Sequence, residues 1–371
     1  MGNPFFELIG VAVGLRRALT SAPSAAGWAA MYAEARRQTL VGVLYAALER
    51  LPAVQRPPRE VLLPWYALAE RIRRESGHLL TEAERLTERL EARGFDAVLL
   101  KGSGVAAYYP NPALRMPGDI DLWLLPKGME PDAIVRGEAR KAVEQFAASV
   151  KTPLQATWLH ADLPLSERAS VEVHFTPSLL CVPRRNARLQ RWLAAQAAVQ
   201  VAHRVPLRPE GRALQVPTTD FNRVYLLLHL YRHFLEEGVG LRQLMDYHYL
   251  LLRGDQPAAG ESALLASLGL TRFAGAVGYV LRRLFGTPET ALPAPVDASA
   301  GRFLLDEVMK AGNFGHYDAR YAPREGETRA QVFLRKSRRS LRFFGMYPAE
   351  VAWSPLFRVW HYCWRFRRHY L

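Results

Sequence analysis

Two aspartates separated by one apolar residue are the first indication of chemistry in this chain. Residues 118–123 are Gly-Asp-Ile-Asp-Leu-Trp, so polar and apolar side chains alternate. Alternate side chains of a strand share a face, and we therefore expect Asp119 and Asp121 to project together while Ile120 and Leu122 face the core. Neighbouring carboxylates repel one another, and a divalent cation relieves that repulsion. The pattern predicts a site for Mg²⁺ or Mn²⁺, which prefer oxygen ligands.

A second alternating segment supplies a third carboxylate. Residues 170–175 are Ser-Val-Glu-Val-His-Phe, which puts Glu172 and His174 on one face of a strand. If this strand lies beside the first, Glu172 completes a cluster that can hold two metal ions, one for an attacking oxygen and one for a triphosphate. His174 then bonds a carboxylate, contacts a substrate or has a packing or hydrogen-bonding role.

A glycine-serine turn ahead of the acidic segments suits a phosphate group. Lys101, Gly102 and Ser103 follow a short apolar run that predicts a strand. Glycine lets the backbone approach a ligand closely, and free amides at a helix start bind phosphate. Lys101 either touches a triphosphate or caps the strand end. A phosphate cradle, two metals and in-line attack are what nucleotidyl transfer needs.

Two arginines are further candidates for contact with the nucleotide. Arg115 lies in the proline-rich loop before Asp119, and its guanidinium suits a phosphate oxygen. Arg242 lies on a later predicted helix, where it either contacts the nucleotide or forms an ion pair with Asp246, four residues on.

Hydrophobic periodicity predicts the elements that position these residues. Apolar residues at helical spacing cover the first ninety residues, and Gly94 follows as a helix stop. Short apolar or alternating runs then predict strands, and beyond about residue 183 the strand signal fades. Helices are predicted at 5–15, 29–50, 60–93, 132–151, 220–236, 241–252, 261–285 and 300–309, and strands at 95–100, 119–125, 154–159 and 170–175.

The order of these parts resembles the polymerase beta-type nucleotidyltransferase superfamily, with its Gly-Ser turn, Asp-x-Asp strand and third carboxylate on a following strand. More narrowly, the chain resembles an uncharacterised bacterial branch over residues 80–255. The resemblance implies the fold, the metal triad and use of an NTP, and it supplies no acceptor. The gap from Ser103 to Asp119 is longer than usual, and we assign the excess to the proline-rich loop. The segments that carry the branch resemblance are Lys101-Gly102-Ser103, Tyr109-Pro110, Arg115, 118–123, Glu172-Val173-His174-Phe175 and 229–252.

We therefore expect an α+β fold, with a small mixed-sheet nucleotidyltransferase core flanked by N-terminal and C-terminal helical regions. The predicted division has a helical region at 1–93, the core at 94–180, a helical domain at 181–328 and a basic aromatic tail at 329–371.

The positive charge of the chain is concentrated in that tail. The 371 residues include 49 Lys or Arg and 35 Asp or Glu, a formal net charge of +14. Residues 329–371 contain ten Lys or Arg and one Glu, a net charge of +9. Phe357, Trp360 and Trp364 fall on one helical stripe among arginines, which could stack bases or lie on a membrane surface. We favour an amphipathic helix docked on the body, with its arginines facing outward.

Cysteine content and hydropathy exclude several classes of protein. Two cysteines, Cys181 and Cys363, exclude a disulfide scaffold and a four-cysteine zinc site, and they fit a reducing cytoplasm. No stretch approaches the roughly 20 apolar residues that span a bilayer. The apolar run 5–15 is followed by Arg16 and Arg17, the wrong order for a secretory signal.

These features predict a metal-dependent nucleotidyltransferase that moves an NMP from an NTP such as ATP to an acceptor, with release of pyrophosphate. The acceptor could be RNA, a protein or a small molecule. One rival is a non-catalytic protein of this fold that binds RNA through its tail, although a retired site has no reason to keep three facing carboxylates. Another is a metal-dependent phosphohydrolase, which more often uses histidine-rich ligation that the predicted core lacks.

Overall fold

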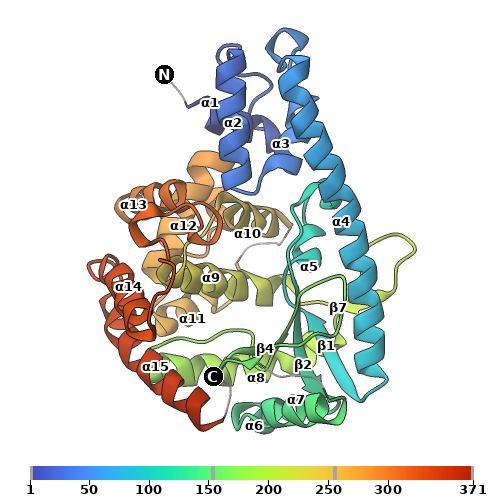
Figure 1. The fold of residues 1–371 in the computed structure, drawn as a ribbon, viewed down its shortest axis with the longest axis vertical. Helices are drawn as coiled ribbons and strands as arrows, with labels where there is room; N and C mark the ends of the chain where they lie inside the picture. Colours follow the sequence, from blue (N-terminus) through green and yellow to red (C-terminus); the bar gives the residue numbers. More distant parts are fainter. Residues whose placement is uncertain (1–2, 152–154, 254–256, 369–371) are drawn as a thin grey trace.

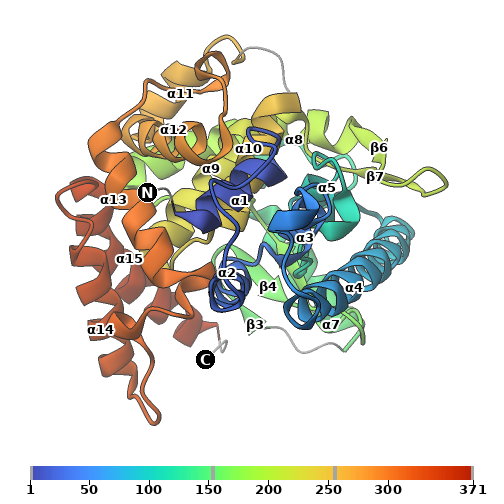
Figure 2. The same cartoon turned by 90° about the horizontal axis from the view of Figure 1, so that it is seen from above.

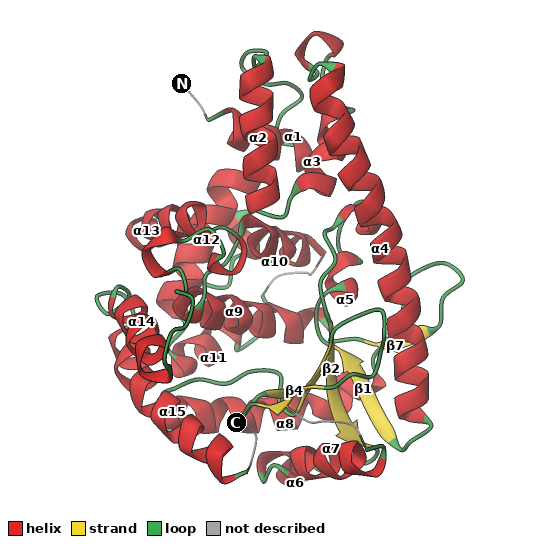
Figure 3. Cartoon of the chain, viewed as in Figure 1, coloured by secondary structure: helices red, strands yellow, loops and turns green. Residues whose placement is uncertain are grey.

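A five-stranded mixed sheet lies at one end of a largely helical protein (Figures 1 and 3). The structure is a computed structural model that describes residues 3–151, 155–253 and 257–368. The strand order is β1-β2-β5-β4-β3, and helices surround the sheet, which confirms the expected α+β fold. The strands are β1 Phe95–Leu99, β2 Ile120–Pro126, β3 Gln155–Ala156, β4 His160–Asp162 and β5 Val171–His174.

Strand pairing sets the two acidic segments side by side. β2 is antiparallel to β1 and parallel to β5, and β4 is antiparallel to β5. The register aligns Asp121 with Glu172. On one sheet face, alternate apolar side chains form a core with α4 (Arg59–Glu91) and α7 (Glu138–Ser149), as the alternation predicted. The residues of β2 and β5 in this core are Ile120, Leu122, Leu124, Val171 and Val173.

The long helix α4 connects the sheet to a second core. Near its start, Trp65 and Ile72 are fully buried in the larger hydrophobic core, and near its end Leu86 and Leu90 pack under the sheet. Gly94, with φ of 84°, follows the helix end as predicted, because glycine adopts this left-handed conformation without a steric penalty. Figures 1 and 2 show α4 along one side of the molecule, away from the C-terminal helices α14 and α15.

The N-terminal helices share the larger core with helices from beyond residue 181. α1 packs against α12, and the predicted single helix over 29–50 is instead two helices separated at Thr39, whose φ is 54°. The predicted division of the chain into four regions stays a prediction. The helices of this core include α1 Pro4–Ala12, α2 Ala25–Arg37, α3 Val41–Leu48, α9 Thr219–Glu236, α10 Leu241–Arg253, α12 Thr271–Phe285 and α13 Ala298–Ala311.

Two other predicted helices are each divided at a glycine. The segment 132–151 forms α6 (Pro131–Val135) and α7, with Gly137 between them at φ of 76°. The segment 261–285 forms α11 (Glu261–Leu268) and α12, with Gly269 between them at φ of 75°. Among the described residues no single helix is long and apolar enough to cross a membrane; α11 and α12 together have the length and composition but are bent by 118°.

Several elements are too short to show a hydrophobic period, so the sequence did not predict them. The sequence predicted no strand at β4 and no hairpin after residue 183. The predicted strand 154–159 is reduced to β3, and residue 154 lies outside the described residues. The elements not yet given are α5 Ser103–Ala106, α8 Pro183–Ala202, β6 Arg204–Pro206, β7 Ala213–Gln215, α14 Arg329–Leu341, α15 Pro348–Arg367 and the 3-10 turns η1 Ala53–Gln55, η2 Pro112–Leu114, η3 Glu289–Ala291, η4 Asn313–Gly315 and η5 Ala319–Tyr321.

The basic tail is docked on the sheet domain through part of α15. The rings of Trp360 and Trp364 lie 4.8 and 5.4 Å from that of Trp158, centroid to centroid, and both pack edge-on. The Trp158 backbone N–H donates to His361 Nε2 at 3.0 Å. Trp364 is partly buried, whereas Trp360 is 44% exposed. The expected docking is therefore present, with nearly half of one aromatic ring exposed. Arg358, which was expected to face outward, is instead partly buried and donates to Ser340 Oγ at 2.7 Å.

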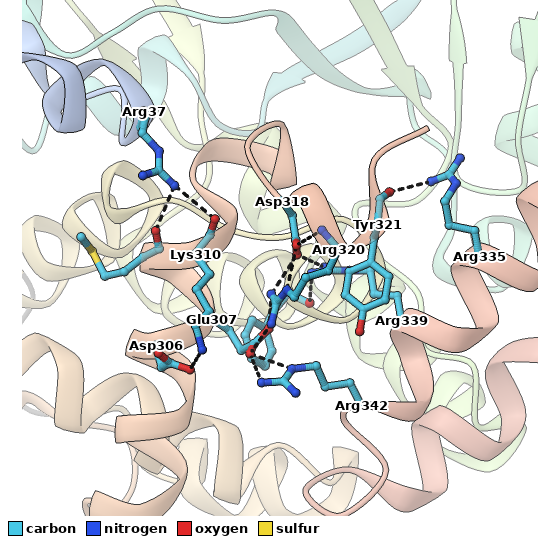
Figure 4. A network of polar contacts seen from close by, with 12 residues as sticks. Arg37, Asp306, Glu307, Lys310, Asp318, Arg320, Tyr321, Arg335, Arg339 and Arg342 are labelled. Carbon is cyan, nitrogen blue, oxygen red and sulfur yellow. Dashed lines mark hydrogen bonds and ion pairs between the residues drawn. The ribbon is translucent and has the colours of Figure 1, made fainter. Parts of the chain in front are cut away.

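A buried carboxylate network fastens α14 to the helical body (Figure 4). Glu307, on α13, is 2% exposed and accepts hydrogen bonds from Arg320 at 2.8 Å and from Arg342 at 2.7 Å. Asp318 accepts from Arg320 at 2.8 Å and from Arg339, on α14, at 3.2 Å. Three arginines thus converge on two carboxylates, and part of the positive charge near the tail is neutralised internally.

We expect Glu307→Gln to lower the free energy of unfolding by about 2 kcal/mol, because two guanidinium groups lose a charged partner. Urea unfolding at pH 7 measures this. The matched control is Asp306→Asn on the same helix; Asp306 pairs with Lys310 but is about half exposed, so its change should stay within about 0.5 kcal/mol. Equal losses in both variants would contradict the role of the network.

The difference in unfolding free energy between wild type and Glu307→Gln should depend on pH. Burial favours the neutral form of Glu307, but hydrogen bonds from Arg320 and Arg342 outweigh it and lower the pKa of its carboxyl. A carboxyl pKa that is lower in the folded than in the unfolded protein stabilises the fold at pH values above the unfolded-state pKa, about 4.3. This stabilisation is lost as the pH falls through the folded-state pKa. The gap in unfolding free energy between wild type and Glu307→Gln should therefore shrink below about pH 4.

Candidate active site

Three carboxylates meet where β2 and β5 lie side by side. Asp119 directly precedes β2, Asp121 lies within it, and Glu172 lies opposite Asp121 on β5. One carboxylate oxygen from each lies within 4.8 Å of the others. Asp121 is buried, whereas Asp119 and Glu172 are partly exposed. The structure thus brings together all three residues that the alternation singled out, with one side of the cluster open.

One carboxylate oxygen of Asp121 has two nitrogen partners, and the other oxygen has none. Lys101 Nζ lies 2.9 Å from Asp121 Oδ1, and His174 Nε2 lies 3.0 Å from the same oxygen. Oδ2 is buried and has no hydrogen-bond partner among the residues that the structure describes. A buried carboxylate oxygen is costly without a partner. This oxygen, with the two other carboxylates, fits a divalent cation held by oxygen ligands.

The surroundings keep Asp121 and Glu172 ionised at neutral pH. Burial favours neutral Asp121, but the charge of Lys101 and the hydrogen bond from His174 outweigh it and lower its pKa. Burial likewise opposes ionisation of Glu172, yet His174 and neighbouring charges lower its pKa to about 2. His174 therefore takes the first of the roles considered for it, bonding a carboxylate. Two ionised carboxylates next to a third carboxyl group attract a cation strongly.

A second histidine lies at this cluster, and the sequence analysis missed it. His160 begins β4, and its Nδ1 lies 3.9 Å from Glu172 Oε2. Its ring centroid is 5.3 Å from that of His174. Burial, with the nearby His174, lowers the pKa of His160 to about 4, so the imidazole is neutral at pH 7. Sequence alternation placed only His174 beside the carboxylates and gave no indication of His160, because a three-residue strand shows no clear alternation.

Lys101 and Gly102 lie beside the carboxylates, as the order of segments suggested, and Ser103 follows them in the chain. Gly102 has φ of 61°, and a Cβ there would lie 3.2 Å from the Asp119 carbonyl oxygen. Ser103 begins α5, a single turn of four residues. Lys101 does more than cap a strand end, since its ammonium also lies 4.0 Å from Asp119 Oδ2.

The two candidate arginines differ in how far they are engaged. Arg115 is 6% exposed and forms a two-pronged pair with Asp246, at 2.7 and 2.8 Å, while Tyr109 Oη donates to the same carboxylate at 2.6 Å. Asp246 thus holds Arg115 through two hydrogen bonds. Arg242 instead donates to the Met116 carbonyl at 2.9 Å, and its buried Nε has no hydrogen-bond partner within the described part of the chain.

The carboxylates open into a cleft of about 620 Å³ between the sheet and the C-terminal helices. One wall carries Lys101, Asp119 and Glu172, and the facing wall includes Arg232 of α9 and Lys336 of α14. A smaller adjoining pocket is lined by Gly102, Arg115 and Arg242 among others. Trp123, on β2, stacks on Phe221 of α9 with ring centroids 6.2 Å apart, so α9 packs over the acidic face of the sheet.

The mixed sheet and its acidic cluster agree with the nucleotidyltransferase fold that the sequence resembles. A family model described as uncharacterised nucleotidyltransferase matches residues 24–286, well over half of the chain. The chain belongs to this nucleotidyltransferase family, which confirms the resemblance and indicates an enzyme that transfers nucleotidyl groups from an NTP. Searches of curated proteins and of solved structures gave no match.

Proposed function

We propose that this protein transfers an NMP from an NTP to an acceptor hydroxyl and releases pyrophosphate. The observation that carries the proposal is the meeting of Asp119, Asp121 and Glu172 within 4.8 Å, at the edge of a cleft large enough for a nucleotide. In the reaction, the acceptor oxygen forms a bond to the α-phosphorus as the bond to the pyrophosphate oxygen breaks.

The three carboxylates would hold Mg²⁺ or Mn²⁺, which neutralises the triphosphate and lowers the pKa of an attacking oxygen. Lys101 lies against Asp121 and Asp119, where it offsets their charge and can meet a phosphate oxygen. His174 bonds the same oxygen of Asp121 that Lys101 contacts, so the carboxylate that offers its unpartnered Oδ2 is fixed in direction.

The nucleotide phosphates are proposed to lie against Gly102 and the following Ser103, with Arg242 also lining the smaller pocket beside Gly102. Arg242 has a buried N–H without a hydrogen-bond partner among the described residues, which supports a ligand contact. Arg115, also proposed as a nucleotide contact, has two of its nitrogens on Asp246. Its contribution to binding is therefore expected to be smaller than that of Arg242.

The function is tested by incubating the pure protein with each labelled NTP, Mg²⁺ and a cell lysate. We expect one NTP to transfer label to RNA, to protein or to a small metabolite, and a chelator to stop the transfer. Transfer identifies the acceptor class directly. If no NTP labels any fraction while the protein binds RNA, the non-catalytic alternative replaces this proposal.

Gly102→Ala tests the phosphate turn. The added Cβ would press on the Asp119 backbone, so we expect NTP affinity to fall about tenfold, roughly 1.4 kcal/mol, in a titration with Mg²⁺-NTP. The left-handed backbone also makes any side chain costly, by about 1–3 kcal/mol of stability. Gly128→Ala is the matched control, since Gly128 has φ of 70° and nothing within 4 Å of its added Cβ. Unchanged NTP affinity in Gly102→Ala would overturn the assignment.

A further inference from the structure

Two imidazoles share a carboxylate with the acidic cluster. His160, Glu172 and His174, which we name the imidazole site, each offer one ligand atom, and these atoms lie within 4.8 Å of one another. Glu172 Oε2 lies 3.5 Å from His174 Nε2 and 3.9 Å from His160 Nδ1. Ligand atoms about 3.4 Å apart surround a tetrahedral zinc ion with bonds near 2.1 Å, so small shifts would bring these atoms to bonding distance.

The environment of His160 points to a missing partner. His160 Nδ1 is buried without a hydrogen-bond partner within the described ranges. His174 Nε2, the nitrogen near Glu172, already bonds Asp121 Oδ1 at 3.0 Å, and a metal ion there would replace that hydrogen bond. Buried ring nitrogens normally bond to protein, water or metal. His160 also lines two clefts beside the sheet, so its side chain borders space that a cation can enter.

We propose that the imidazole site binds a zinc-class transition-metal ion, distinct from the Mg²⁺ or Mn²⁺ of the carboxylates. Imidazole nitrogen suits Zn²⁺ and Co²⁺, whereas Mg²⁺ prefers oxygen. Two histidines and one glutamate leave a fourth position open, as in catalytic rather than structural zinc sites.

The site has a consequence for nucleotidyl transfer, and this consequence rests on the proposed function. Glu172 belongs to both ligand groups. A zinc ion in the imidazole site therefore draws Glu172 away from the cation of the three carboxylates. The metal site itself needs no catalytic activity in order to be tested.

Titration of the full-length protein with Co²⁺ tests the site, because a four-coordinate cobalt ion with nitrogen ligands absorbs visible light strongly. We expect one equivalent of Co²⁺ to give this spectrum and one equivalent of Zn²⁺ to abolish it. Losing an outer partner of a metal ligand costs about 10–100-fold in affinity, so His160→Ala should weaken binding at least about 100-fold. His160→Gln, which keeps more of the side-chain volume, should do the same, and thermal melting of both variants verifies the fold.

Two matched variants complete the test. His316→Ala removes an exposed histidine that lines the same cleft, and it should leave the cobalt spectrum unchanged. Asp119→Asn removes a ligand of the acidic cluster that is not part of the imidazole site, and it should weaken Mn²⁺ binding more than Co²⁺ binding. If folded His160→Ala keeps full Co²⁺ affinity, or if Asp119→Asn abolishes the cobalt spectrum, the proposal is overturned.

The outcomes separate this inference from the proposed function. A histidine-dependent cobalt spectrum in a protein that transfers no nucleotide would leave the metal site standing and remove nucleotidyl transfer. Mg²⁺-dependent transfer in a protein without that spectrum would support nucleotidyl transfer and remove the imidazole site.

Discussion

Asp121→Asn is expected to abolish nucleotidyl transfer while the protein stays folded. The substitution removes charge and not volume, so the packing of β2 is preserved, but the buried Oδ2 that fits a cation is replaced. Metal stabilisation of a transition state is worth several kcal/mol, and a loss of about 4 kcal/mol corresponds to roughly a thousandfold in rate. Label transfer at saturating NTP and Mg²⁺ measures the loss.

The effect of Asp121→Asn on stability differs from what two repelling carboxylates alone suggest. Relief of repulsion would raise the melting temperature, but Lys101 and His174 already offset the charge of Asp121. Removing it leaves a largely buried ammonium with Asp119 at 4.0 Å, and a buried cation without a close partner is costly. We therefore expect a modestly lower melting temperature.

Asp96→Asn is the control for this variant. Asp96 lies on β1 of the same sheet and accepts a hydrogen bond from Gln215 at 2.9 Å, which an asparagine oxygen can still accept. Its transfer rate should remain within about twofold of wild type. A wild-type rate in Asp121→Asn would remove that residue from the reaction and with it the proposed metal cluster.

Deletion of residues 351–371 is expected to destabilise the protein strongly. The deletion removes the buried Val351 and the edge-on ring contacts that Trp360 and Trp364 make with Trp158. Loss of one large buried side chain costs about 3–5 kcal/mol, and we expect a loss of at least that size in urea unfolding. Phe366→Ala is the control, because Phe366 on the same helix is 66% exposed and should change stability by less than about 0.5 kcal/mol.

The same deletion distinguishes docking from recruitment of a polyanion. If the tail recruits RNA, deletion spares stability and weakens RNA binding, and binding by the full chain falls steeply with salt because each neutralised phosphate releases counterions. RNA titrations of both forms at several salt concentrations measure this. Equal, salt-insensitive binding by both forms rules out recruitment, and wild-type stability of the deleted form contradicts docking.

Local pattern in the sequence was sufficient for the elements and for which side chains share a face. Strand alternation has a period of two, so it predicted that Ile120 and Val171 lie in the core and that Asp121 and Glu172 both point to the opposite face. Long, strongly periodic segments such as α4 were also predictable within a few residues. The breaks between helices were not predictable, because Thr39 and Gly137 interrupt helices through positive-φ backbone conformations, which a hydrophobic pattern does not reveal.

What surrounds the three carboxylates was decided by tertiary structure. Pairing between strands brings together residues about fifty positions apart, and no local period specifies the partner or its register. Asp246 was expected to pair with Arg242 one helical turn away, yet it binds Arg115 across 131 positions, because the fold buries both charges together and each then needs a close partner. The position of His160 beside Glu172 was also decided by tertiary structure, because a strand of three residues is defined by its neighbours in the sheet and not by its own sequence.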